Sequence, residues 1–318
     1  MAGNRGARRF LVLLGLSALF CGCAAFAPLT LAQTASQAVS ATDDRGKKVT
    51  LSRPARRIVT LAPHLTELVF ASGAGRQLVG VARFSDFPPA ARDIPQIGDS
   101  ALMEFERIVA LKPDLILAWK SGNAPADVER LESLGYPVFV SESARLGDVP
   151  RVLRSIGTLA GTLPEASSAA ADFEKEIRAL RERFAKAPRV RVFYMIWRKP
   201  LMTVNGAHLI SDAITLCGGE NVFAGIRQLT PPVTLEAVIA AKPRAVLGGS
   251  DPVGGGTFVA EWRAFAPVPL RDLPAFYINP DLIQRPTQRI VDGARAICSA
   301  LEQVRSGRGN PEKAGKVN

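Results

Sequence analysis

Few residues in this chain could do chemistry, and the most reactive types come in pairs. The 318 residues include two histidines, His64 and His208, which are too few for a three-histidine zinc site, although His64 with carboxylates could hold a metal. The sequence contains no G-x-S-x-G elbow, no phosphate-binding G-K-[ST] loop, no H-E-x-x-H and no C-x-x-C. These absences favour a binding protein and leave a secreted metal-dependent enzyme as the alternative from another class.

Two glutamates recur in a repeated motif. The stretch FERIVALKPDLILAW, residues 105–119, returns as LEAVIAAKPRAVLGG, residues 235–249, with a Glu, an Ala, a Lys-Pro pair and a Leu in the same order. Each copy predicts a short helix, a stop at proline and a buried strand. The helix dipole favours Glu106 or Glu236 alone in a first helical turn, but it explains less well why both copies have one.

The elements around these residues predict two related α/β lobes. RRIVTLAPHLTELVFASGAG, residues 56–75, indicates a strand, a proline stop and a helix that ends at glycine, and RVRVFYMIW followed by HLISDAITLCGGE repeats this order. His64 and His208 stand at corresponding points ahead of the two helices. Helices that alternate with short β-branched strands predict parallel sheets.

A single helix is expected to join the lobes. The stretch bounded by Pro164 and Pro188 consists of about twenty strong helix formers, with acidic residues early and basic residues late. Such a helix cannot bend at mid-span without losing hydrogen bonds, so we expect the lobes to move little. The expected fold is α/β, with two lobes bridged by one long rigid helix and a ligand cleft between them. Its expected parts are a signal peptide (1–32), a polar leader (33–55), an N-terminal lobe (56–150), an interlobe helical region (151–187), a C-terminal lobe (188–304) and a flexible basic tail (305–318).

The N-terminus predicts export. Three arginines precede the apolar run FLVLLGLSALFCGCAAFA, and small residues follow it, as in a secretory signal peptide. Cleavage after Ala32 is preferred because Thr30 and Ala32 are small. A lipoprotein with Cys23 as the modified residue is the alternative, although Phe20 and Cys21 fit that pattern poorly. A retained membrane anchor would need about 20 unbroken apolar residues.

Two cysteines remain after export. Cys217 and Cys298 then share an oxidising compartment, and a disulfide between them is the economical interpretation. Closing a loop of this size contributes on the order of 4 kcal/mol in the chain-entropy description. Two buried free thiols are the alternative.

The net charge of +11 does not indicate nucleic-acid binding. The signal peptide carries +3 and the tail a net +3, which leaves +5 for the remaining residues. No basic stripe with interleaved aromatic residues is left in that part of the sequence. We therefore expect no nucleic-acid partner.

Four stretches of the sequence together form a recognisable pattern: VGVARFSDFPPAARDIPQIGD, FERIVALKPDLILAWKSGN, TLCGGENVF and PDLIQRPTQRI, in this order. With these stretches the chain resembles the periplasmic cobalamin-binding receptors of bacterial ABC importers. The resemblance covers roughly residues 56–303 and is most specific in the second stretch. It implies a metal-receptor fold with a ligand between the lobes, no enzymatic activity and no resident cofactor, with a corrinoid as the transported ligand.

The resemblance also implies a set of ligand contacts. Aromatic faces suit a flat macrocycle, and charged side chains can bind its amide rim. Trp197 is added because Ser100, Met202, Thr230 and Leu282 stand where the family has further cleft aromatics, and His64 because its helix would begin at the cleft. Core packing is the alternative for Trp119, and capping or packing for His64. The expected ligand-binding residues are Phe84, Trp119, Trp197, Asp281, Leu282, Ile283, Gln284, Arg285 and His64.

The repeated glutamates gain a role from the same resemblance. It implies that Glu106 and Glu236 protrude from the two lobes and meet arginines of a dimeric permease with its ATPase subunits. The protein is expected to be a monomer when free. A receptor for heme or an iron-siderophore of the same fold is the alternative, because the pocket has fewer aromatic residues.

Overall fold

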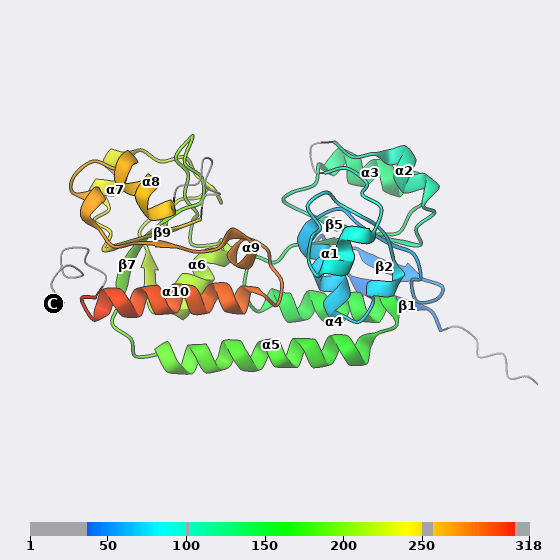
Figure 1. Ribbon diagram of the computed structural model, residues 1–318. Helices are drawn as coiled ribbons and strands as arrows, with labels where there is room; N and C mark the ends of the chain where they lie inside the picture. The colour runs from blue at the N-terminus through cyan, green and yellow to red at the C-terminus, as the bar shows by residue number, and fades with distance from the viewer. Residues whose placement is uncertain (1–36, 100–101, 250–256, 309–318) are drawn as a thin grey trace, which may run out of the picture. The chain divides into compact units, whose positions relative to one another are not determined.

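The computed structural model describes residues 37–99, 102–249 and 257–308 (Figure 1). The expected signal peptide, Cys23, Ser100 and residues 309–318 of the expected tail lie outside this part of the chain. Within it, no helix is both long enough and apolar enough to cross a membrane.

The N-terminal lobe is built on a parallel four-stranded sheet in the order β4-β3-β5-β6. The strands are β3 (Ile58–Thr60), β4 (Leu78–Val81), β5 (Leu115–Trp119) and β6 (Val138–Ser141). The helices are α1 (Pro63–Ala71), α2 (Phe105–Ala110), α3 (Pro125–Ser133) and α4 (Asp148–Ala160), with short 3₁₀ turns at Gly75–Gln77 and Pro89–Asp93.

The C-terminal lobe has a second parallel sheet in the order β10-β9-β7-β8. When the four strands of each sheet are numbered in chain order, both sheets have the order 2-1-3-4 from one edge to the other. This shared order confirms that the lobes are structurally related. The strands are β7 (Val190–Met195), β8 (Gly219–Asn221), β9 (Ala245–Gly248) and β10 (Ala275–Tyr277). The helices are α6 (Leu209–Leu216), α7 (Leu235–Ala240), α8 (Phe258–Phe265), α9 (Pro280–Ile283) and α10 (Ile290–Arg305), with a 3₁₀ turn at Leu270–Asp272.

Successive strand residues point to opposite faces, and this alternation separates the cores. Ile58 and Leu117 of one lobe and Val192 of the other belong to one large core that also includes α1, α4, α5, α6 and α10. The opposite faces form separate cores under α2 and α3 in the first lobe and under α7 and α8 in the second. The helices of the repeated motif, α2 and α7, therefore cover the sheet faces that point away from the shared core (Figure 1).

The repeated motif folds alike in both lobes. Lys112 and Lys242, which follow α2 and α7, both adopt the left-handed backbone conformation with φ 46°, and the proline after each prevents a further helical turn. An arginine then caps each helix: Arg57 donates to the Leu111 carbonyl at 2.6 Å, and Arg191 donates to the Ala241 carbonyl at 2.7 Å. The predicted helix, proline stop and buried strand are confirmed in both copies.

A helical hairpin joins the lobes. Helix α4 ends at Gly161, which has a φ of 74°, and α5 (Leu163–Phe184) returns beside it. A Cβ on Gly157 would lie 2.4 Å from that of Ala166, so glycine is what allows this close approach. The single long bridging helix is confirmed as α5, whereas the expected interlobe region also contains most of α4.

The expected polar leader is wrong for its described part. Residues 39–51 form an antiparallel hairpin of β1 (Val39–Thr42) and β2 (Lys48–Leu51). Asp43 organises its turn by accepting the Arg45 and Lys47 amides at 2.9 Å. The alternating residues Val49 and Leu51 point into the shared core, which is why this segment folds onto the lobe.

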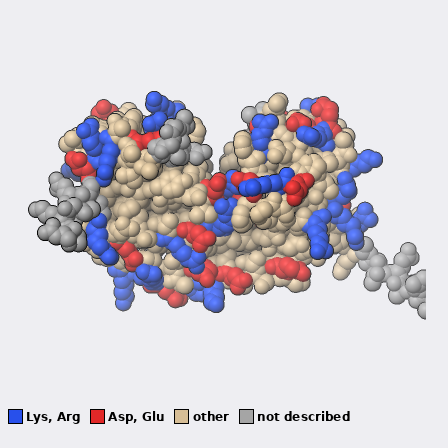
Figure 2. Space-filling view, in the orientation of Figure 1, with Lys and Arg blue, Asp and Glu red and all other residues tan. Residues whose placement is uncertain are grey.

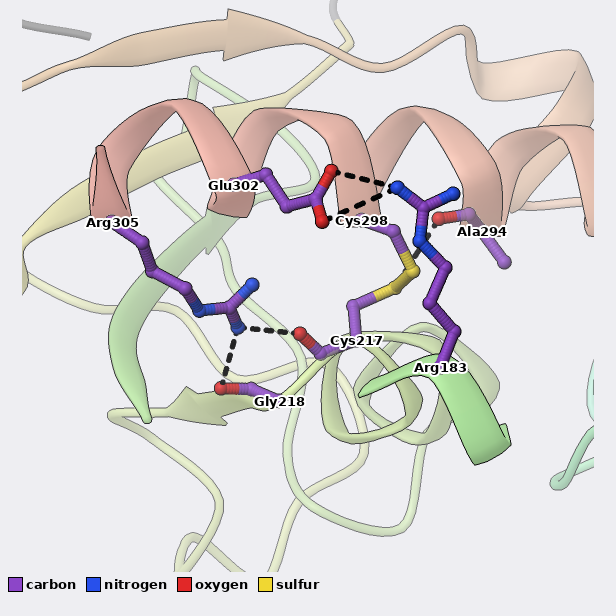
Figure 3. Close-up of a disulfide and its surroundings, with 7 residues drawn as sticks. All are labelled: Arg183, Cys217, Gly218, Ala294, Cys298, Glu302 and Arg305. Atoms are coloured by element: carbon purple, nitrogen blue, oxygen red, sulfur yellow. Dashed lines mark hydrogen bonds and ion pairs between the residues drawn. A yellow bond between two sulfur atoms is a disulfide. The ribbon is translucent and has the colours of Figure 1, made fainter. Parts of the chain in front are cut away.

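The predicted disulfide between Cys217 and Cys298 is confirmed (Figure 3). It ties the end of α6 to α10 across 81 residues, in the shared core. Beside it, Arg305 donates to the carbonyls of Cys217 and Gly218 at 2.6 and 3.2 Å (Figure 3). Arg305 is the last residue of α10, so the expected tail does not begin at residue 305.

Candidate functional site

The N-terminal lobe brings two predicted residues to its crevice. In sheets of this strand order, ligands bind outside the carboxyl ends of the first and third strands, where the order reverses. Trp119 is the last residue of the third strand, β5, and His64 follows the first strand, β3, in α1. Their ring centroids are 5.2 Å apart, with the planes at 84°.

His64 is 5% exposed and packs edge-on against Trp119. Burial, and then the positive charge of Arg285, lowers the pKa of His64 to about 3, so the imidazole is neutral. The histidines are not equivalent, because His64 lies inside α1 whereas His208 caps α6 by accepting the Ile210 amide at 3.1 Å. The packing alternative for His64 therefore describes the structure, and a contact with a ligand's metal stays a hypothesis.

Trp119 is half-buried. Its indole Nε1 donates to Glu142 at 3.4 Å, and its backbone amide donates to Asn123 at 2.7 Å. The indole packs against the shared core with part of its surface. Ligand contact by Trp119 thus remains a prediction that is compatible with its packing role.

The C-terminal lobe has a cavity of 480 Å³ at the equivalent point, outside the carboxyl ends of β7 and β9. Three predicted residues line it, namely Trp197, Asp281 and Gln284. Trp197 is 62% exposed and Tyr277, on the cavity wall, is 49% exposed. Two largely exposed aromatic side chains therefore line this cavity, as a site for a large flat ligand requires.

Arg285 is the centre of a charged group that we call the interlobe ion cluster. Its guanidinium lies 3.0 Å from Glu67, 2.8 Å from Asp86 and 2.9 Å from Asp281, and Arg289 lies 3.1 Å from Glu67. Burial alone would lower the pKa of Arg285, but hydrogen bonds to Asp86 and Glu67 raise it above its ordinary value. Since Glu67 and Asp86 come from the N-terminal lobe, the cluster joins the two lobes beside the cavity.

The residues of the predicted contact segment 281–285 point in different directions and have different surroundings. Ile283 is fully buried in the shared core, so its predicted ligand contact is wrong for the side chain in this structure. Leu282 is half-buried, and Arg285 is held by carboxylates. Segment position alone could not predict this, because successive residues of the short helix α9 point in different directions.

Ligand contact by Phe84 remains a prediction, with which the exposure of this residue is compatible. Its backbone has a φ of 67°, which a bulky residue rarely adopts, and its ring is 64% exposed. Its carbonyl accepts a hydrogen bond from Arg285 at 3.5 Å. The loop thus holds an exposed aromatic ring next to the interlobe ion cluster.

Glu106 and Glu236 are both exposed, in the first turns of α2 and α7. A hydrogen bond from its own backbone and another from the Thr234 hydroxyl lower the pKa of Glu236, so this carboxylate stays ionised. Both helices cover outer sheet faces, and neither side chain lines the cavity. Docking by this pair remains a prediction.

Two further observations concern the charged and metal-ligating side chains. Basic and acidic side chains are interspersed over the described residues of the face in Figure 2. Within the described ranges, no group of three or more His, Cys, Asp or Glu side chains could hold a metal ion. Exposed aromatic residues and a few charged groups line the cavity.

Sequence reasoning missed Tyr277, Arg198 and Lys199, all of which line the cavity. The sequence could have indicated the basic pair, because Arg198 and Lys199 directly follow the predicted ligand-binding residue Trp197 after strand β7. It also missed Glu67 and Asp86 as partners of Arg285, which lie 218 and 199 positions away in the sequence. No local pattern could have revealed pairs at that separation.

A cavity at the strand ends of one of two related lobes, joined by a long helix, is typical of a ligand-binding protein. The chain belongs to the periplasmic binding protein family, which it matches over residues 58–260. A vitamin B12-binding protein of Vibrio parahaemolyticus is 32% identical over 254 residues, 80% of this chain and 92% of that protein. Another, of Pectobacterium carotovorum, is 35% identical over 79% of this chain and 90% of that protein.

Solved structures agree with this assignment. The periplasmic vitamin B12-binding protein BtuF of Vibrio cholerae has a TM-score of 0.72 and 31% identity, covering 79% of this chain and 98% of that chain. The heme-binding protein RhuT of Roseiflexus has a TM-score of 0.68 but 23% identity, so it shows the shared fold alone. The chain is a periplasmic binding protein with a transport role rather than an enzyme.

Proposed function

We propose that this protein captures a corrinoid, with cobalamin as the first candidate, and delivers it to an ABC importer. The observation that carries the proposal is the 32–35% identity to vitamin B12-binding proteins over about four-fifths of the chain. The cavity supports it, because Trp197 and Tyr277 offer apolar faces to a macrocycle while Asp281 and Gln284 offer polar groups to its amide rim. Phe84 and Trp119 would contact the ligand from the other lobe.

The same proposal includes export and delivery. A signal peptide cleaved after Ala32 would bring the chain to the periplasm as a monomer, with no lipid at Cys23. Glu106 and Glu236 would then meet arginines of the permease dimer, one on each half. Their placement on α2 and α7, on outer faces of two lobes of equal strand order, supports a paired contact with a symmetric partner.

Heme or an iron-siderophore is the alternative ligand of the same fold. The heme-binding structures similar to this chain are under 25% identical and so do not favour it. The cleft has fewer aromatic residues than the family pattern, with Met202 and Thr230 in place of two of them. Hemin therefore has to be tested as a ligand beside the corrinoid.

Purification with a bound chromophore tests the proposal. The full-length chain is expressed with its N-terminus, recovered from the periplasm of cells supplied with cyanocobalamin and hemin, and examined by visible absorbance and intact mass. We expect a stoichiometric corrinoid spectrum and a mass that begins at residue 33. A heme spectrum alone would replace the corrinoid by the alternative ligand, and a lipid-modified mass beginning at Cys23 would replace the proposed cleavage.

A further inference from the structure

We propose that Arg198 and Lys199 form an anion-binding subsite at the cavity of the C-terminal lobe, which takes the phosphate diester of a complete corrinoid. This inference rests on the proposed function and makes it more specific. It predicts that the protein distinguishes a corrinoid that carries its nucleotide loop from one that lacks it.

The first support is position. Arg198 and Lys199 follow the carboxyl end of β7 and line the cavity with Trp197 and Tyr277. Arg198 is half-buried and Lys199 is exposed, and both line the cavity. A ligand whose flat face covers Trp197 would bring its side groups to these two residues.

The second support is the turn that carries them. The Trp197 indole Nε1 donates to the Lys199 carbonyl at 2.9 Å. Met202 closes the turn, since its amide donates to the Trp197 carbonyl at 2.9 Å and its carbonyl accepts the Ile196 amide at 3.1 Å. The indole and the two basic side chains therefore belong to one hydrogen-bonded turn, which limits the entropy lost when a ligand binds.

The third support is the state of the charges. No ion pair joins Arg198 or Lys199 to a carboxylate within the described ranges. The acidic residues of the cavity wall are engaged: Asp281 pairs with Arg285 at 2.9 Å, and Glu261 has an interaction of its own. Among the described residues of the cavity wall, the charges that have no ion-pair partner are therefore positive.

A phosphate diester suits these groups. A guanidinium can donate two parallel hydrogen bonds to phosphate oxygens, and an ammonium adds a compact charge beside it. Because Arg198 is half-buried, salt screens its interaction with a phosphate less than it would screen an interaction between two fully exposed charges. Carboxylates, such as those of hemin, would satisfy the same donors, so the experiment must separate the two sources.

Titration calorimetry with two corrinoids tests the inference. Cyanocobalamin carries the phosphate diester and dicyanocobinamide does not. Both corrinoids, and hemin in separate titrations, are titrated into the wild type and into a variant with Arg198→Gln and Lys199→Gln. We expect the variant to bind cyanocobalamin at least about tenfold more weakly and dicyanocobinamide within about twofold of the wild type. Raised salt should weaken cyanocobalamin binding by the wild type more than by the variant.

A control variant has the same charge change on the bridging helix α5, with Lys175→Gln and Arg178→Gln, both exposed. It should bind both ligands as the wild type does. Equal weakening of both corrinoids by the Arg198 and Lys199 variant, or no weakening of either, would overturn the subsite while the proposed function stands. A wild type that binds neither corrinoid, or hemin alone, would overturn both.

Discussion

In the interlobe ion cluster, Arg285 pairs with one buried and two more exposed carboxylates. We expect the buried carboxylate to contribute more to the free energy of unfolding than either exposed one. Arg285 pairs with Glu67, Asp86 and Asp281, whose side chains are 3%, 47% and 50% exposed. The perturbation is Glu67→Gln, which keeps the shape of the side chain and removes its charge. Arg289, which also contacts Glu67, would keep its stacking on Phe87 and could still donate a weaker hydrogen bond to the neutral amide oxygen.

The magnitude follows from the contacts. Glu67 accepts two charge-assisted hydrogen bonds, from Arg285 at 3.0 Å and from Arg289 at 3.1 Å. Such bonds contribute about 1.5–3 kcal/mol each and about half as much when the acceptor is neutral, so Glu67→Gln should lower the free energy of unfolding by about 2 kcal/mol. Asp281→Asn should lower it by at most about 0.5 kcal/mol, because an exposed ion pair contributes little.

Urea unfolding of the wild type and the two variants, followed by circular dichroism, measures the difference. The midpoint should fall clearly for Glu67→Gln and barely for Asp281→Asn, at an unchanged m-value. A loss for Asp281→Asn as large as that for Glu67→Gln would refute the reasoning. So would a Glu67→Gln protein within about 0.5 kcal/mol of the wild type.

Three further predictions concern the disulfide, the buried histidine and the paired glutamates. Replacing Cys217 and Cys298 by serine should destabilise the protein by up to about 4 kcal/mol, measured by urea unfolding, and reductant should then have no further effect. Because the pKa of His64 is about 3 when folded and 6.5 when unfolded, the unfolded chain takes up the proton first as the pH falls. Stability should therefore decrease from about pH 6.5 toward pH 3, by about 2 kcal/mol at pH 5 from this group, and His64→Asn should flatten the profile. Replacing Glu106 and Glu236 by alanine should leave corrinoid affinity unchanged and abolish uptake in a reconstituted transporter, and wild-type uptake by the double variant would contradict the docking role.

The fold could be predicted largely because its signals are local. The Lys-Pro motif marks the end of a helix and the start of a buried strand, and both copies do this with the same backbone conformation at Lys112 and Lys242. The expected loss of the signal peptide would leave Cys217 and Cys298 as a single cysteine pair, so the disulfide could be predicted from the number of cysteines. The hairpin of residues 39–51 was missed because each strand shows only four residues of alternation in a polar stretch.

The site could be predicted only in part, because side-chain direction and long-range partners are not local. Trp197, Asp281 and Gln284 do meet at one cavity. Ile283, between two of them, faces the core instead. Arg285 was expected to face the ligand. Two of the three carboxylates that hold it, Glu67 and Asp86, come from the other lobe, and no sequence pattern connects them to it.

Direct titration of the mature chain tests the corrinoid proposal most simply. Cyanocobalamin is titrated calorimetrically into the protein beginning at residue 33, and hemin is titrated separately under the same conditions. The proposal predicts saturable binding of one cyanocobalamin per chain and no comparable binding of hemin. The proposal would be contradicted if hemin bound while cyanocobalamin, at every concentration tested, released no heat and showed no shift in its absorbance spectrum.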